Sequence, residues 1–338
     1  MKEQLLDWWI NKDKLTDDEQ RIAKMRRPED IVNSFNYNNI IDEYFRLMPC
    51  CNLTSNTHKI EVAPTARELI TKLFTHCVDD DTLIIYSSSE HQSVVENVNR
   101  FKHSLSITTD EIQQLNFSNI LREIKNYKKV FVYIIGTEIS TGRIIPQKFY
   151  TRIKQILVNN NKEHVIVSDD VHGMFITPRD YSIFDYIIGT AHALVVGYNM
   201  GIIITKKENP EFGIIATNWL EEYLKPLNVV LSRKEKLYDF YKVISMYLED
   251  YVYDKRTKLL PNITPNIFAL RIPKTIISEK LRLQLREYQI KVEGYNVDNT
   301  QHCFIRMRGQ QFITDSSYLK PGLELLKGYL DFVFEMHS

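Results

Sequence analysis

The feature that most constrains the fold is the alternation of short β-rich runs with amphipathic segments between residues 59 and 206. In the amphipathic segments, such as "ARELITKLFTHC", apolar residues recur at intervals of three and four, which is the helical period. Strands that alternate with helices form a mostly parallel sheet with helices on its faces. We therefore predict an α/β fold with a mostly parallel seven-stranded sheet flanked by helices. Its strands are "KIEVAPT", "TLIIYSS", "SLSITT", "KVFVYIIG", "HVIVSDD", "DYIIGTA" and, after a short turn and so antiparallel, "GIIITK".

The alternation of strands and helices ends after Pro210. A long helical stretch follows, which we predict to be broken at Pro226 because proline disrupts a helix interior. The remainder alternates short strands and helices and predicts a smaller α+β domain. We therefore expect an N-terminal helical segment over residues 1–50, a large α/β domain over 51–235 and a small C-terminal domain over 236–338.

Charge and cysteine content exclude several classes of function. Lys and Arg together number 43 and balance 43 Asp and Glu, so no overall field attracts nucleic acid or an acidic membrane surface. The N-terminus shows no secretory pattern, and no apolar run is long enough to span a bilayer. The 4 cysteines are irregularly spaced, and no cysteine pair or histidine cluster has metal-site spacing. We expect a cytoplasmic protein with no metal, nucleic-acid or membrane partner.

Polar residues follow several of the predicted strands, in "APTARE", "SSSEHQS", "SDDVHG" and "GTAHAL". Ligands of open α/β sheets bind at the carboxyl ends of the strands, so these residues are the candidates for a site. Each also has a plainer interpretation. Thr65 at a helix start is usually a cap, His91 is an exposed helix-start histidine, and Asp169 beside Asp170 fits a magnesium ligand or a turn.

Taken together, these motifs resemble the fold-type I pyridoxal phosphate (PLP) enzymes, particularly the class V aminotransferase and cysteine desulfurase branch. The resemblance covers roughly residues 59 to 206 and extends loosely into the C-terminal part. It implies that Thr65 and the Ala66 amide bind the cofactor phosphate, although Pro64 stands where the family usually has glycine. It implies that His91 lies flat against the pyridine ring and that the "TGRIIP" loop faces the cofactor.

The strand "VIVSDDVHGMF" carries the strongest local similarity. By resemblance, Asp169 pairs with the pyridine nitrogen and His172 reaches toward the ring hydroxyl. A carboxylate beside the pyridine stabilises its protonated form, and that charge lets the ring accept electrons from a substrate carbanion. Asp170 is expected to point to the other face of the sheet.

The segment "GTAHALVVGYNMG" resembles the family's S/T-x-H-K motif with its glycine turn and return strand. Thr190 and His192 align with the phosphate-side residues, whereas Ala193 stands where the family has the lysine that binds the cofactor covalently. Lys206 and Lys207 end the next strand, and we expect them at the far edge of the sheet. His192 has the chemistry to move a proton at neutral pH, but imidazole does not replace the covalent lysine.

In the predicted small domain, "CFIRMRG" resembles the strand that supplies the family's arginine for the substrate carboxylate. Arg306 is the first candidate, and Arg308 lies two residues on, on the same face of the strand. The alternative is that both are solvated strand charges.

The resemblance implies a lysine-less homologue of PLP-dependent aminotransferases and desulfurases. Such a protein binds PLP or a PLP–amino acid adduct noncovalently, or serves as a noncatalytic subunit. Other hypotheses stay open: an active PLP-dependent transferase or lyase on an amino acid or amine with His192 as base, an engineered replacement at Ala193, or a cofactor-free scaffold. Family active sites lie at subunit interfaces, so a homodimer, or a heterodimer with a catalytic paralogue, is expected. The substrate does not follow from the sequence.

Overall fold

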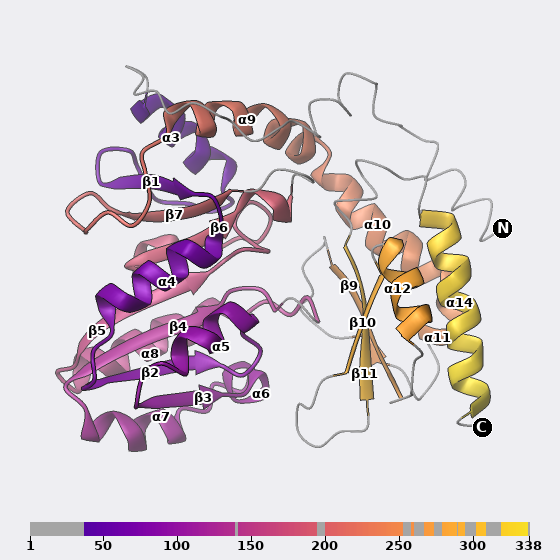
Figure 1. The fold of residues 1–338 in the computed structure, drawn as a ribbon, viewed down its shortest axis with the longest axis horizontal. Coiled ribbons are helices and arrows are strands. Elements are labelled where there is room, and N and C mark those ends of the chain that lie inside the picture. The colour runs from indigo at the N-terminus through magenta and orange to yellow at the C-terminus, as the bar shows by residue number, and fades with distance from the viewer. Residues whose placement is uncertain are drawn as a thin grey trace.

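Two separate sheets organise the chain, as the computed structural model shows (Figure 1). The predicted N-terminal helical segment is described from its thirty-seventh residue, where α3 (Tyr37–Leu47) is helical; the rest of that prediction lies outside the described residues. The structure describes residues 37–138, 141–194, 200–252, 258–259, 267–273, 279–288, 290–294, 302–308 and 319–336.

The first sheet has seven strands in the order β1-β7-β6-β5-β4-β2-β3. The pairs from β3 to β6 are parallel, and β7 runs antiparallel to both β6 and β1. The predicted fold class, a mostly parallel seven-stranded sheet with an antiparallel return strand, is confirmed. The strands are β1 (His58–Ala63), β2 (Thr82–Ser87), β3 (Ser104–Ile107), β4 (Lys129–Ile135), β5 (Glu163–Asp169), β6 (Tyr186–Thr190) and β7 (Gly201–Lys206).

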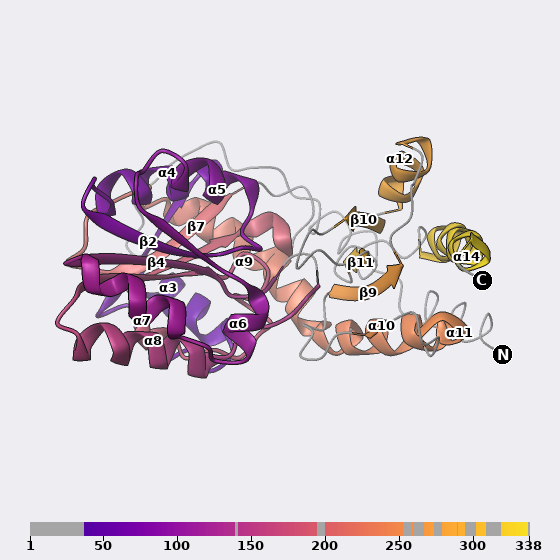
Figure 2. The same ribbon diagram turned by 90° about the horizontal axis from the view of Figure 1, so that it is seen from below.

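Helices cover both faces of this sheet (Figure 2). Successive strand side chains point to opposite faces, and along β4 both sets are apolar. Phe131 and Tyr133 pack into the core under α4 and α5, whereas Val130 and Val132 pack into the core that α8 covers. The helices here are α4 (Ala66–Cys77), α5 (Gln92–Val98), α6 (Thr109–Gln113), α7 (Ser118–Glu123) and α8 (Gln147–Asn159), with short 3-10 turns at Ile124–Asn126, Tyr181–Ile183 and Ala191–Ala193.

The prediction of a helix break at Pro226 is wrong. Helix α9 (Thr217–Ser232) continues through this residue and ends six residues later, before α10 (Lys234–Tyr247) begins. A proline removes one helical hydrogen bond and strains its preceding turn, which costs about 3 kcal/mol. Here the neighbouring side chains of Tyr223, Leu224 and Leu227 are buried in the large core, so burial of this helix face offsets that cost.

The second sheet has four strands in the order β10-β11-β9-β8, all antiparallel. It has its own core, to which α10 contributes Phe240 and Ile244 and the C-terminal helix contributes Leu323 and Leu330. We therefore propose the division after residue 235 as the domain boundary. The elements are β8 (Lys258–Leu259), β9 (Ile267–Pro273), β10 (Ile290–Gly294), β11 (His302–Arg308), α11 (Glu249–Val252), α12 (Glu279–Glu287) and α14 (Leu319–Met336).

Candidate functional site

A cavity of about 230 Å³ lies at the carboxyl ends of β4, β5 and β6, beside the N-terminal ends of α4 and α5. This is the edge at which ligands of open α/β sheets bind. The polar strand ends that the sequence singles out meet here. The lining residues are Thr65, Ala66, Arg67, Ile70, His91, Ser93, Ile135, Asp169, Val171, His172, Thr190 and His192.

A close approach between β7 and the start of α4 brings one end of the cavity together. Gly201 pairs with Thr190 across the sheet, and a Cβ atom at Gly201 would lie 2.5 Å from the Ala66 nitrogen. A larger residue at Gly201 would push the helix start away from the sheet. Thr65 caps the helix, its hydroxyl accepting the Glu68 amide at 3.3 Å. The first-turn amides and the positive end of the helix dipole therefore lie beside Thr190.

The hydrogen bonds of Thr190 assign the tautomer of the neutral His192 ring. The Thr190 hydroxyl lies 3.1 Å from the carbonyl oxygen of Met200, which only accepts, and 2.7 Å from His192 Nδ1. A hydroxyl has one proton to donate, and the carbonyl takes it. His192 Nδ1 is therefore the donor to Thr190, so in the neutral ring Nε2 carries the lone pair.

His91 caps α5 at the opposite side of the cavity. Its Nδ1 accepts the backbone amide of Ser93 at 3.2 Å and lies 2.9 Å from the Ser93 hydroxyl. Because an amide only donates, the neutral His91 ring carries its proton on Nε2. The imidazole is exposed and lines the cavity, as a residue that contacts a ligand must.

Asp169 is the buried carboxylate of the cavity, with 4% of its surface exposed. Its Oδ2 accepts the Tyr133 hydroxyl at 2.8 Å and its Oδ1 accepts the Val171 amide at 3.2 Å. Burial raises the pKa of Asp169 to about 6, although the hydrogen bonds from Tyr133 and Val171 lower it. Asp169 is therefore mostly charged at neutral pH, and among the described residues no lysine or arginine forms an ion pair with it.

Asp170, the next residue, points away from the cavity, as predicted. Its Oδ2 forms an ion pair with Arg179 Nε at 3.0 Å and accepts the Tyr181 hydroxyl at 2.6 Å. All of these groups are buried. The charge of Asp170 is therefore neutralised inside the fold.

Ala193, which the resemblance aligns with the family's lysine, is buried outside the cavity. Ala193 ends the short 3-10 turn after β6, is 1% exposed and does not line the cavity, whereas its neighbour His192 does. No lysine is among the described residues that line the cavity. Lys206 ends β7 and lies five positions along the strand from Gly201 at the cavity edge. At about 3.3 Å per residue, that strand places Lys206 about 16 Å away, at the far edge of the sheet.

Sequence reasoning missed one charged cavity residue, Arg67. It lies in the first turn of α4, is 61% exposed at its side chain and pairs with Glu96 at 3.1 Å. A cation in the first turn is unfavourable for the helix dipole, and this unusual placement is the signal in the sequence that could have marked Arg67 as a candidate. Arg306 and Arg308 lie on β11 of the second sheet and are not among the cavity residues; their side chains lie outside the described ones.

Among the described residues, no three histidine, cysteine, aspartate or glutamate side chains form a cluster that could hold a metal ion. Within the same ranges, no helix is long and apolar enough to cross a membrane.

The sequence matches no protein-family profile and no curated protein. The fold is nonetheless shared with solved structures. A NifS-like protein from Rickettsia africae is 15% identical, with a TM-score of 0.64 over 93% of this chain and 97% of that one. A PLP-bound putative aminotransferase from Clostridium difficile is 12% identical, with a TM-score of 0.63 over 91% and 88%. Ureidoglycine–glyoxylate aminotransferase from Bacillus subtilis is 15% identical, with a TM-score of 0.58 over 94% and 97%.

Proposed function

We propose that the cavity binds PLP or a PLP–amino acid adduct noncovalently and that the chain is a lysine-less homologue of PLP-dependent aminotransferases and desulfurases. The observation that carries this proposal is Asp169, a buried carboxylate that faces the cavity without a cationic partner in the described chain. Keeping such a charge buried is costly unless a ligand supplies the opposite charge. Solved structures of the same fold include proteins described as PLP-bound.

The polar groups around the cavity fit both ends of PLP. The protonated ring nitrogen matches Asp169, and the phosphate matches the start of α4 with Thr65 and Arg67, beside Thr190. His91 remains the candidate for the ring face, and His172 for the ring hydroxyl. When bound, PLP supplies an electron-withdrawing ring, and the chain supplies orientation and charge.

A noncovalent site has a consequence for exchange. Because Ala193 carries no amine, no covalent bond to that position holds the ligand, and affinity rests on the polar contacts of the cavity. We therefore infer that the ligand exchanges by dissociation. A noncatalytic subunit that presents or stores the ligand, alone or beside a paralogue, fits this property.

One observation favours a second candidate function, an active enzyme on an amino acid or amine. His192 lines the cavity, and its bond to Thr190 leaves Nε2 as the basic nitrogen of the neutral ring. An imidazole held in that tautomer accepts a proton near neutral pH. Loss of turnover in His192→Ala with PLP binding retained is the expected result, and undiminished turnover contradicts this candidate.

The test of the proposal is equilibrium dialysis of the purified protein against PLP, with visible spectra. We expect binding by the unmodified chain and by Glu163→Gln, which changes an exposed carboxylate at the other end of β5. We expect binding to fall about 10- to 100-fold in Asp169→Asn, since a charged hydrogen bond contributes about 1.5–3 kcal/mol. Equal affinity of all three proteins contradicts the role of Asp169, and no binding by the unmodified chain contradicts the function.

A reduction experiment tests the missing lysine directly. After treatment with borohydride and denaturation, PLP bound noncovalently is released, whereas PLP joined to a lysine stays on the chain. We expect release from the unmodified protein. A reduced PLP label on any lysine, located by peptide mapping, contradicts the noncovalent proposal.

A further inference from the structure

Glu90 is a buried acid that the proposed function does not use. It follows β2, immediately before His91, and only 9% of its surface is exposed. Its Oε1 accepts the Ile135 amide at 2.6 Å, and its Oε2 is buried without a hydrogen bond. A buried carboxylate oxygen without a donor is costly, so the protonation state of Glu90 needs an explanation.

The position of Glu90 couples it to the cavity. Ile135, which Glu90 binds, is the last residue of β4 and pairs across the parallel sheet with Asp169. Both Ile135 and Asp169 line the cavity. Burial first, and the charge of Asp169 second, hold the pKa of Glu90 well above its usual range. Two buried carboxyls at one sheet edge therefore compete for one proton.

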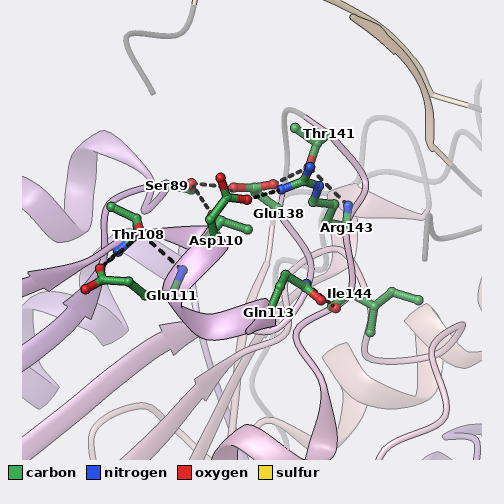
Figure 3. Close-up of polar contacts among 10 residues, drawn as sticks. Ser89, Thr108, Asp110, Glu111, Gln113, Glu138, Thr141, Arg143 and Ile144 are labelled. Atoms are coloured by element: carbon green, nitrogen blue, oxygen red, sulfur yellow. Dashed lines mark hydrogen bonds and ion pairs between the residues drawn. The ribbon is translucent and has the colours of Figure 1, made fainter. Parts of the chain in front are cut away.

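A third carboxylate, Glu138, lies in the loop after β4, and both of its oxygens accept hydrogen bonds (Figure 3). It accepts hydrogen bonds from the hydroxyls of Ser89, Thr109 and Thr141, the Thr109 bond being 2.5 Å long. Three donors stabilise its negative charge. Glu138 is thus the member of the group whose ionised form the structure supports best.

The hydrogen-bond donors around Asp169 and Glu90 indicate which of these two acids is ionised. Asp169 has a hydroxyl and an amide directed at its two oxygens, and it opens to the cavity. Glu90 accepts the Ile135 amide at Oε1, with a smaller contribution from the backbone of Ser87, and its Oε2 is buried without a hydrogen-bond partner. The titratable groups around Glu90 are Asp169 on β5, Glu138 in the loop, Tyr133 on β4 and Tyr150 on α8, and none of them is a cation.

We propose that Glu90 is a positioning residue that holds a proton on Oε2, so that of the two coupled carboxyls only Asp169 is charged at the cavity. The neutral Glu90 keeps its bond to the end of β4 and adds no second negative charge. Asp169 then ionises at neutral pH and presents a single charge to a ligand with one positive charge at that point. The link to PLP rests on the proposed function, but the position of the proton does not.

The first test is infrared spectroscopy of the ligand-free protein, where a protonated carboxylic acid has a carbonyl band separate from that of a carboxylate. At about pH 8, roughly two units above the pKa of about 6 of Asp169, we expect this band in the unmodified protein. We expect it to be lost in Glu90→Gln and retained in Glu138→Gln, the matched control in the same cluster. Persistence of the band in Glu90→Gln, or its absence from the unmodified protein, overturns the proposal.

Isotope labelling provides the same answer if Glu90→Gln does not fold. Carbon-13 at the glutamate side-chain carboxyl shifts the band if a glutamic acid carries the proton, and label at aspartate does not. A glutamate shift retained in Glu138→Gln supports Glu90. A shift with labelled aspartate overturns the proposal.

The second test follows Asp169, because glutamine reproduces the neutral form of glutamic acid. In Glu90→Gln we expect the Asp169 titration to stay near its midpoint in the unmodified protein. A fall of about one pH unit or more would mean that Glu90 is charged in the native state. Neither test uses PLP, so failure to bind PLP removes the proposed function and leaves this inference to be judged by the spectra.

Discussion

Asp169 and Asp170 are adjacent, both are buried, and they serve opposite sides of the same sheet. The carboxylate of Asp170 has a buried guanidinium partner in Arg179, whereas that of Asp169 has two uncharged donors and faces a cavity. The chain thus neutralises one charge internally and leaves the other to be neutralised from outside. The comparison separates a charge that holds the fold from a charge that is available to a ligand.

On the side with Asp170, hydrogen bonds cross-link the fold in addition to the ion pair. Arg179 also donates to the carbonyl oxygen of Gly136 at 2.8 Å, and Tyr181 donates to Asp170. These bonds tie the turn after β5 to the end of β4. Removing one partner of such a pair leaves an uncompensated buried charge.

The largest expected effect is therefore on the Asp170 side. Asp170→Asn leaves Arg179 without its counter-charge, and we expect the free energy of unfolding to fall by about 3–5 kcal/mol. Urea unfolding at neutral pH measures it. A loss under about 1 kcal/mol would contradict the structural role of Asp170, because the Asp170–Arg179 ion pair would then contribute no more than a solvent-exposed ion pair.

Asp169→Asn is expected to behave in the opposite way. The pKa of Asp169 is raised from 3.8 to about 6, so its contribution to stability is present below about pH 4 and is lost as the pH rises through 6. At pH 7 the ionised acid thus costs up to about 3 kcal/mol that asparagine does not. We expect the difference in unfolding free energy between Asp169→Asn and the unmodified chain to grow from pH 4 to pH 7. A variant less stable than the unmodified protein at pH 7 contradicts this sign.

Much of this comparison was readable from the sequence, and the rest was not. Polar residues after four of the predicted strands predicted the cavity edge, because parallel strands bring their carboxyl ends together. The alternation of strand residues predicted that Asp169 and Asp170 face opposite ways. Which partner neutralises Asp170 depends on how the turn to Arg179 folds back, and no local pattern encodes that.

The failures have the same physical origin. Propensity predicted a break at Pro226, but tertiary burial of the surrounding helix prevailed. Glu138 and Ser89 are 49 residues apart, and they meet because β2 and β4 are neighbours, a pairing that single-sequence periodicity does not specify. The sequence alone therefore did not predict that the buried acids Glu90 and Glu138 lie close together; this follows from the strand order.

The proton on Glu90 gives a further pH-dependent effect on the cavity side. The pKa of Glu90 is raised above 4.5 by burial, so the stability it contributes is present at low pH and is lost as the pH rises toward its folded value. Glu90→Gln lacks this proton linkage. We therefore expect the unfolding free energy of Glu90→Gln, relative to that of the unmodified protein, to rise with pH. The rise is up to about 1.4 kcal/mol per pH unit between the unfolded and the folded pKa of Glu90. Urea unfolding across pH checks it, and two parallel profiles would contradict a raised pKa.

The smallest expected effect concerns Arg67, the exposed charge at the other end of the cavity. Arg67 and Lys72 lie on the same helix and each pairs with a glutamate, at 3.1 Å and 3.0 Å, but only Arg67 lines the cavity. A solvent-exposed cation contributes modestly because water and salt screen it. We expect Arg67→Gln to weaken PLP binding by about three- to tenfold, with pyridoxal binding unchanged, and Lys72→Gln to leave both unchanged.

Removing the charge of Glu96, which competes with a ligand phosphate for Arg67, should raise the affinity for PLP. Glu96 holds the Arg67 guanidinium at 3.1 Å, so a ligand phosphate must draw the arginine away from it. We expect Glu96→Gln to strengthen PLP binding by a few-fold and to make it more sensitive to salt, because more of the arginine charge then acts on the phosphate. Equal losses in Arg67→Gln and Lys72→Gln would mean that the net charge of the helix matters and not a contact, and the cavity would then have Asp169 as its single charged ligand group.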